Sequence, residues 1–295
     1  MPTYHTHVDV VKELGYVEET TYGTTPTSPT FTNVGPVTNF HYTNDITATR
    51  YRVLGKEDIA TGLKCGELYS FEFEYSPDTT TFPRYGTEAQ GGGAGTIDKS
   101  LSIAFSHKLD AVENYVTLAG ARTDSISLEW TPEDVTVRQN FIAKNISTPN
   151  TAHGLGASTV FASDFSGTPL CGTDAGTNPL TINSLNYDCI RFRIDINRNL
   201  DARRIIGSQQ IAYLVPGNRD INIDFDILAK DNVTIADAKA LTARTASMVL
   251  NSTGPKTLSL TGLQLEKHDV TFASDSNEIV MYTFSGFAKA ATLTA

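Results

Sequence analysis

One glycine-rich stretch of the chain invites comparison with a phosphate-binding loop. Residues 91–100 read GGGAGTIDKS, and such loops wrap an anion in backbone amides. A Walker A motif places Gly directly before its Lys, whereas here Asp98 precedes Lys99. That carboxylate would lie where the phosphate should go, so we expect no nucleotide site.

One group of acidic and amide residues has the character of metal ligands. Asp220, Asn222 and Asp224 have the spacing that opens a calcium loop, yet Phe225 stands where the loop needs Gly and Asp231 where it needs Glu. The alternating Ile and Phe residues predict a strand here instead.

The histidines and cysteines give no metal or catalytic pattern either. His5 and His7 have no carboxylate or Cys nearby, so we interpret them as part of a solvated terminus. Cys65, Cys171 and Cys189 form no CxxC or Cys/His cluster, and we expect buried thiols. No GxSxG, HExxH or triad spacing occurs. The sequence thus predicts no cofactor, no metal and no enzyme, unless a site is assembled from scattered residues.

The composition narrows the possible partners. The net charge of −10 and the pI near 5.0 disfavour tight binding to a phosphate backbone. Arginines concentrate in the second half but are interleaved with aspartates, which predicts ion pairs between strands or between subunits. The N-terminus has neither a basic segment nor an apolar run, and about 18 consecutive apolar residues occur nowhere. We expect neither export by a signal peptide nor a membrane span.

Period-2 alternation predicts a mainly β protein. An apolar residue alternates with a polar one in each pattern, as a half-solvated antiparallel strand requires. The clearest patterns lie at 69–76, 126–130, 190–196 and 221–227.

The chain repeats itself. Residues from Asn44, NDITATRYRVLG, correspond to residues from Asn197, NRNLDARRIIG, and Leu118–Trp130 correspond to Leu260–Phe272. Each half closes on a Phe, Ala, Lys group, Phe141, Ala143 and Lys144 in the first, Phe287, Ala288 and Lys289 in the second. The sequence predicts one unit of ~150 residues used twice.

The predicted units differ in detail. The first copy with an N-terminal arm covers 1–150, a linker rich in Gly, Ser, Thr and Pro covers 151–179, and the second copy covers 180–295. A helix is expected at about 232–243 behind Asp231 as its cap. Its counterpart near 78–90 contains Pro83 and Gly86, so the first copy has either a shorter helix or none.

The segment GYVEETTYGTTPTSPTF at residues 15–31, followed by duplicated β units with GxxxxFxF strands and a closing FxAK group, resembles the tail tube (major tail) proteins of tailed bacteriophages and archaeal head-tailed viruses. The similarity extends over roughly 16–290. It implies β-sandwich units with a flanking short helix, whose strands join those of neighbouring subunits into a closed β-barrel around a channel.

The resemblance also implies a function. The protein would be a virion structural protein, assembled in the host cytoplasm, whose rings stack into a tube for genome delivery with other tail proteins and passing double-stranded DNA as partners. An acidic conduit suits DNA that must not stick. Three chains with two units each would form a pseudo-hexameric ring, and six chains are the alternative. The competing function is a duplicated β-sandwich binding module for a receptor, for adhesion or for virion decoration.

Two sets of residues follow from this interpretation. The lumen-facing candidates are Glu72, Glu74, Asp224 and Asp226, which occupy the polar face of equivalent strands. Alternation fixes which residues share a face but not whether that face is the lumen or the exterior. The candidates for ring stacking, in the N-terminal arm 5–17 and the loops 45–62 and 199–213, are Val8, Val10, Tyr16, Arg50, Arg203 and Arg204.

Overall fold

The computed structural model describes residues 11–52, 59–77, 81–88, 99–109, 112–147, 160–161, 169–177, 179–228, 233–251, 256–271 and 280–294. Strands dominate this part of the chain and its helices are short, so the predicted mainly β class is confirmed. The predicted linker 151–179 and the glycine-rich loop 91–98 lie largely outside the described residues.

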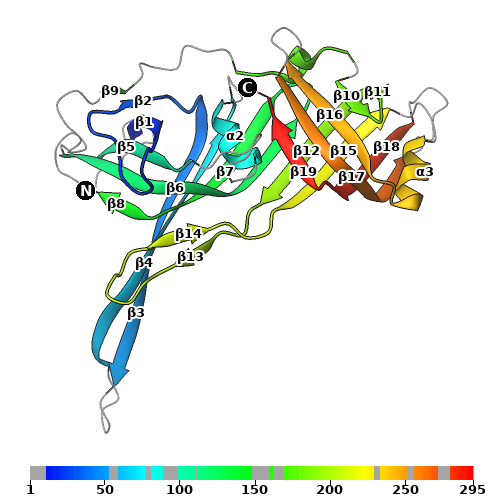
Figure 1. Ribbon diagram of the computed structural model, residues 1–295. Coiled ribbons are helices and arrows are strands. Elements are labelled where there is room, and N and C mark those ends of the chain that lie inside the picture. The colour runs from blue at the N-terminus through cyan, green and yellow to red at the C-terminus, as the bar shows by residue number, and fades with distance from the viewer. Residues whose placement is uncertain are drawn as a thin grey trace, which may run out of the picture.

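The elements occur in the following order (Figure 1): β1 (Val11–Glu18), β2 (Thr30–Phe31), β3 (Val37–Arg52), β4 (Ile59–Tyr75), α2 (Thr81–Thr87), β5 (Leu101–Leu109), β6 (Val112–Trp130), β7 (Val135–Ala143), β8 (Asn145–Ser147), β9 (Val160–Phe161), the 3₁₀ turn η2 (Gly172–Ala175), β10 (Leu180–Ile182), β11 (Leu185–Tyr187), β12 (Cys189–Asn197), β13 (Asp201–Arg203), β14 (Tyr213–Val215), β15 (Asp220–Leu228), α3 (Val233–Ala240), β16 (Arg244–Asn251), β17 (Lys256–Thr271), β18 (Met281–Phe287) and β19 (Ala290–Leu293).

Eight strands form one continuous antiparallel layer, which we call the eight-strand layer. Its order is β3-β4-β7-β6-β12-β15-β18-β17. The remaining strands of the same sheet form what we call the cover layer. β1, β5 and β8 pair around the first half of β6, while β10, β11, β16 and β19 gather around the first half of β17.

The apolar side chains of the eight-strand layer face the cover layer and make one core. In the first half, Phe73 is fully buried and its ring lies 5.2 Å from that of Phe40 and 6.0 Å from that of Phe82 in α2. Phe40 in turn contacts Phe105 of β5 at 4.8 Å, although β3 and β5 do not pair. The alternation predicted from sequence therefore gives a sandwich-like fold with one dry face.

The order of four strands occurs twice in the eight-strand layer. β3-β4-β7-β6 in the first half and β12-β15-β18-β17 in the second have the same sequence order and the same neighbours. Even the irregularities recur, because β3 and β12 have a bulge at equivalent places, after Val37 and after Cys189. The bulges of β6 and β17, after Thr123 and after Leu265, are also equivalent.

A glycine corner recurs where the chain passes from one layer to the other. Gly120 in β6 and Gly262 in β17 have φ angles of +69° and +65°, a region that residues with a side chain rarely adopt. The backbone amides of Lys144 and Lys289 bond to the carbonyls of Ala119 and Thr261, which precede these glycines. Glycine is required at both corners.

This register corrects one detail of the sequence comparison. Lys144 and Lys289 are equivalent, as predicted. The strand pairings, however, place Phe287 opposite Gln264 in the second copy, in the same way that Ile142 is opposite Arg122 in the first. Phe287 is thus the counterpart of Ile142 instead of Phe141. The aromatic match suggested by sequence alone was wrong by one residue.

Both copies have a helix at the predicted place. α3 spans Val233–Ala240. In the first copy, where Pro83 and Gly86 left either a shorter helix or none, the structure has the shorter helix, α2 at Thr81–Thr87. α2 packs against β6 and α3 against β17, so each helix covers the equivalent strand of its own half.

We predict that Gly120→Ala and Gly262→Ala each lower the free energy of unfolding by about 1–3 kcal/mol, because a Cβ would be strained at positive φ. It would also lie 2.7 Å from Lys144 Cβ in the first case and 2.8 Å from Lys289 Cδ in the second. Denaturant unfolding measures the change. Gly62→Ala is the matched control, since its Cβ would meet no atom within 4 Å, and an equal loss in that variant would contradict the strain argument.

Candidate functional site

The face of the eight-strand layer that points away from the cover layer is polar, and we call it the open polar face. It is made by the side chains that alternate with the core residues on every strand, and the pairing registers place them in rows across both halves of the chain. One row runs Glu74, Arg138, Ser127, Asp195, Asn222. The face therefore belongs to the whole chain and not to one copy.

The four carboxylates singled out from sequence all lie on the open polar face. Glu72 and Glu74 are on β4, and Asp224 and Asp226 are at the equivalent positions of β15. All four are partly exposed. Asp224, which has the spacing of a calcium-loop ligand in the sequence, alternates with buried Ile223 and Phe225 in a strand, as predicted.

The first pair of carboxylates shares one cation. Arg138 of β7 lies 3.3 Å from Glu72 and 2.6 Å from Glu74, and the hydrogen bond to Glu74 raises the pKa of the arginine. Sequence reasoning missed Arg138, because it stands alone on its strand and 64 residues from its partner. The carboxylates of the first copy are therefore partly neutralised.

The second pair is less strongly compensated. Arg191 of β12 donates to Glu129 of β6 at 2.7 Å and lies 4.0 Å from Asp226. Arg193 donates to Asp195 on its own strand at 2.9 Å. The ion pairs predicted for these arginines thus form both between strands and along one strand.

Carboxylates outnumber cations on the open polar face. Those assigned to it by register are Asp45, Glu72, Glu74, Glu129, Asp195, Asp220, Asp224, Asp226 and Asp269, against Arg122, Arg138, Arg191, Arg193 and Lys267. The face keeps a net negative charge after every cation is paired. Such a surface repels a polyanion at short range.

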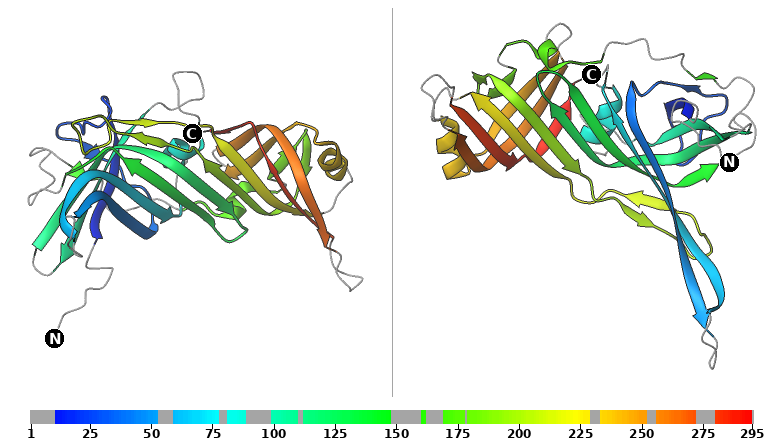
Figure 2. Two further views of the ribbon diagram at one scale, coloured as in Figure 1. Left: turned by 90° about the horizontal axis from the view of Figure 1, so that it is seen from below. Right: turned by 180° about the vertical axis from the view of Figure 1, so that it is seen from behind.

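Two hairpins project from the same side of the body (Figure 1; Figure 2, right). One is formed by the outer parts of β3 and β4, and the other by β13 and β14. Arg204 and Gln209 of the second donate to the carbonyls of Glu67 and Lys64 in the first, at 2.9 and 3.2 Å. Hydrogen bonds therefore connect the two hairpins, although the hairpins belong to different halves of the chain.

The hairpins carry most of the exposed large apolar side chains of the described residues. Ile206 is fully exposed at 106%, and the others are Ile46, Tyr51, Leu63, Ile205, Tyr213 and Val215. Exposed apolar groups gathered on projecting elements are typical of protein contact surfaces.

The residues predicted to mediate ring stacking differ in their exposure. Arg50 is exposed on β3, Arg203 is exposed on β13 and pairs with Asp201 at 2.8 Å, and Arg204 bonds to the neighbouring hairpin. Val8 and Val10 lie outside the described residues. Tyr16 is buried in the core, with its ring 4.6 Å from that of Phe82, so we do not carry it forward as a contact residue.

Part of the N-terminal arm is a strand of the fold. β1 begins at Val11 and pairs with β5, and the chain after it folds back over the first glycine corner. There the buried carboxylate of Glu19 accepts bonds from Ser100 and Ser102 at 2.6 Å and from the amide of Gly120 at 2.7 Å. The YVEETTYGTTP segment therefore has a structural role that its sequence did not reveal.

The two halves are also joined by a buried arginine. Arg198, which follows β12, donates to the carbonyl of Gly86 at 2.9 Å and to that of Glu88, while Arg219 donates to the carbonyl of Thr87 at 2.8 Å. Burial, with nearby Arg219, lowers the pKa of Arg198 to about 9. Cations from the second half thus cap the C-terminal end of α2 in the first.

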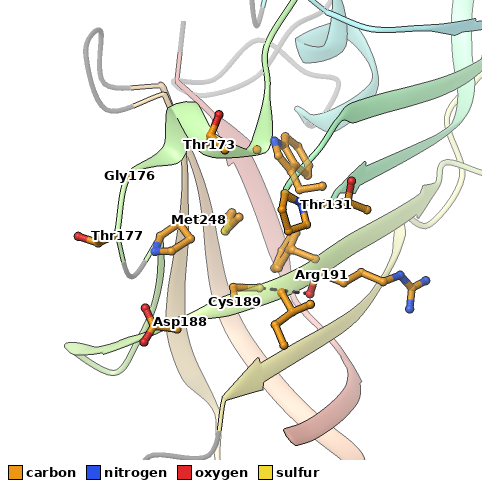
Figure 3. A pocket seen from close by; sticks show the side chains of 14 residues that line it. Thr131, Thr173, Gly176, Thr177, Asp188, Cys189, Arg191 and Met248 are labelled. Carbon is orange, nitrogen blue, oxygen red and sulfur yellow. Dashed lines mark hydrogen bonds between the residues drawn. The ribbon is translucent and has the colours of Figure 1, made fainter. Parts of the chain in front are cut away.

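A cavity of about 300 Å³ lies near the junction of the halves, lined by Trp130, Cys189 and Met248 among others (Figure 3). Burial raises the pKa of Cys189 to about 12, and its thiol donates to the carbonyl of Arg191 at 3.2 Å. A thiol that stays protonated at neutral pH is a poor nucleophile. The guanidinium of Arg191 extends away from the cavity (Figure 3).

The cysteines depart from the sequence expectation in one respect. Cys65 is exposed on β4, and Cys171 and Cys189 are partly buried, so the prediction of buried thiols was wrong for Cys65. Among the described residues, no three His, Cys, Asp or Glu side chains are grouped in a way that would hold a metal ion.

The comparisons with known proteins identify the family of the chain. A family model described as phage tail tube protein matches residues 11–288. The chain belongs to the phage tail tube protein family. No curated protein matches it. Membership in this family makes the protein a structural component of a virion tail, and it implies oligomeric assembly with other tail proteins.

The tail tube family is structural, so membership in it implies a protein that is not an enzyme. In the part of the chain that the structure describes, no helix has the length and apolarity needed to cross a membrane. The candidate functional surfaces are therefore the open polar face, the two projecting hairpins and the free edges of the eight-strand layer.

Proposed function

We propose that the chain is a self-assembling tail tube subunit, whose rings stack around a channel through which the genome is delivered. The observation that carries this proposal is the repeat of β3-β4-β7-β6 as β12-β15-β18-β17 in one sheet. A head-to-tail repeat of like units is a heterologous contact, which closes into a ring when its rotation allows. The subunits would assemble in the host cytoplasm and enter the virion tail.

The repeat supports a ring of three copies. We divide the chain into a first unit at 1–150, a linker at 151–179 and a second unit at 180–295, so that three chains supply six units. Both units place four strands in the same layer, whereas the six-chain ring requires that only part of each half enters the barrel. The three-copy ring with pseudo-sixfold appearance is therefore the one we propose.

We assign the open polar face to the channel, and the dimensions of the proposed barrel support this assignment. Twenty-four strands, spaced about 4.8 Å apart and tilted by about 40°, make a barrel about 48 Å across. A cover layer inside that barrel would take up about 10 Å of radius on every side. With the cover layer outside, Glu72, Glu74, Asp224 and Asp226 face the lumen, and their charge keeps DNA from adhering while it passes without sequence-specific contact.

The hairpins are assigned to contacts between successive rings. They lie on the same side of the body (Figure 1), and the exposed Ile205, Ile206 and Tyr213 would be buried by the next ring. Arg50, Arg203 and Arg204 lie on the same elements. The N-terminal residues before β1, Val8 and Val10 among them, remain part of this stacking proposal.

The alternative, a binding module, has less support. A receptor-binding or decoration surface would gather exposed Trp and Tyr around a recess. The single tryptophan, Trp130, is buried with its ring 6.1 Å from that of Phe192. The exposed tyrosines Tyr51 and Tyr213 are on the hairpins assigned to stacking.

Electron microscopy of the concentrated purified protein tests the function. We expect open tubes or stacked rings, and image averaging without imposed symmetry should show a threefold axis with six similar lobes. Compact single subunits at every concentration would support the binding module, and a true sixfold axis would rule out the three-copy ring.

Replacing Ile205 and Ile206 by Ser should leave single rings that no longer elongate into tubes, because the apolar surface buried between rings is lost while the core is untouched. Negative-stain microscopy and sedimentation measure ring and tube populations. Leu185→Ser, which removes an exposed apolar side chain elsewhere, is the matched control. Tubes of ordinary length from the Ile205/Ile206 variant would contradict the stacking assignment.

Replacing Asp224 and Asp226 by Lys should give tubes that assemble but retain double-stranded DNA at low salt, with release as added salt screens the new charges. Co-sedimentation of tubes with DNA over a salt series measures this. The control changes Glu133 and Asp188, exposed residues outside the open polar face, to Lys. DNA retention that is equal in the two variants would place the carboxylates outside the lumen.

A further inference from the structure

The junction between the two halves of the chain is a strand pairing with a defined register. β6 of the first half pairs antiparallel with β12 of the second, with Glu129 opposite Arg193, Ser127 opposite Asp195 and Ser125 opposite Asn197. Just beyond it, the amide of Arg198 donates to the carbonyl of Asp124 at 2.8 Å. This pairing is the only place where the two four-strand groups meet within the described eight-strand layer.

The outermost strands of the eight-strand layer are the counterparts of those that meet at the junction. β3 occupies in the first group the place of β12 in the second, and β17 occupies the place of β6. The residue equivalences follow from the shared bulges and registers. Asp45 corresponds to Asn197 through β4 and β15, and Lys267 corresponds to Ser125 through β7 and β18.

Both outer strands have a free edge. Among the described strands, β3 pairs only with β4, and the second half of β17 pairs only with β18. An unpaired edge presents backbone donors and acceptors to any strand that fits. α3 does not block the edge of β17, since β6 carries α2 in the equivalent place and still pairs with β12.

We propose that β17 of one copy pairs antiparallel with β3 of a second copy in the register of the internal junction, so that Lys267 lies opposite Asp45, Asp269 opposite Thr43, and Thr271 opposite His41. The partner is a second copy of this chain. The inference rests on the proposed ring and specifies its seam residue by residue.

Charge complementarity favours this register. Asp45 is exposed on β3, and the Lys267 side chain is 69% exposed and held by Asp269 at 2.7 Å. Lys267 and Asp45 lie on the open polar face, where the internal junction has the uncharged pair Ser125 and Asn197. Opposite charges directly across a strand pair stabilise it. At this position the seam between copies thus carries an ion pair where the internal junction has an uncharged pair.

A second contact replaces the buried arginine of the internal junction. Arg198, which caps α2, corresponds in β3 to Ile46, and α2 corresponds to α3, which is followed by Leu241. Ile46 and Leu241 are 55% and 51% exposed in the single chain. If the seam repeats the internal junction, the register that pairs Lys267 with Asp45 also places Ile46 at the end of α3. Two exposed apolar side chains would then cover each other.

Cross-linking tests the register. In a Cys65→Ser background, Asp45→Cys with Lys267→Cys should give disulfide-linked chains on oxidation of assembled tubes, because directly opposed residues lie within disulfide reach. The denaturing gel should show a ladder that ends at three chains. Thr43→Cys with Lys267→Cys is the control, two residues out of register and about 7–8 Å apart, with little cross-linking expected.

The outcomes separate the seam from the function. Tubes that form but cross-link better in the control pair overturn the register and leave the tail tube proposal intact, whereas a wild-type protein without rings or tubes overturns both. A ladder that ends at six chains keeps the register and rejects the three-copy ring.

Charge exchange gives an independent measurement in case the cysteine variants do not assemble. Asp45→Lys alone and Lys267→Asp alone should each raise the critical concentration for assembly about fivefold, and the double exchange should restore it to within about twofold of wild type. Defects that simply add in the double variant would overturn the pairing of Asp45 with Lys267.

Discussion

Backbone hydrogen bonding between β6 and β12 is the constraint on which the rest of the structure depends. It joins two four-strand groups into one layer, and because strand pairing fixes alternation, it forces the polar residues of both groups onto the same face. A slip of one residue at this junction would turn the second group over and place Phe225 and Phe284 in solvent. The continuous core and the open polar face are two results of the same register.

Much of the fold could be predicted from sequence, because its main signals are local. Alternation around Phe71 and Phe73 requires only neighbouring residues to be compared, and the two copies of the pattern reveal the repeat. The placement of Glu72, Glu74, Asp224 and Asp226 on one face follows from the same period. Tail tube family membership was likewise accessible from the N-terminal segment and the repeated strands.

The remainder depends on contacts between distant residues, which no local pattern encodes. Arg138 neutralises part of the acidic face only because β7 lies beside β4. Glu19 is buried because β1 brings it to the corner at Gly120, and Tyr16 is core because α2 supplies Phe82. The sequence comparison matched Phe141 with Phe287 because both closing groups contain Phe, Ala and Lys. The hydrogen-bonded strand registers instead make Ile142 the counterpart of Phe287.

The two projecting hairpins differ in form, since the outer parts of β3 and β4 continue strands of the eight-strand layer, whereas β13 and β14 are separate strands of three residues each. In the proposed ring of three copies, hairpins of the two forms would alternate around the circumference. Each ring would then fit the next in three rotational settings instead of six, because a hairpin of one form does not occupy the place of the other. The duplication within the chain would thus restrict the helical twist of the whole tube, a property that a ring of six identical units would not have.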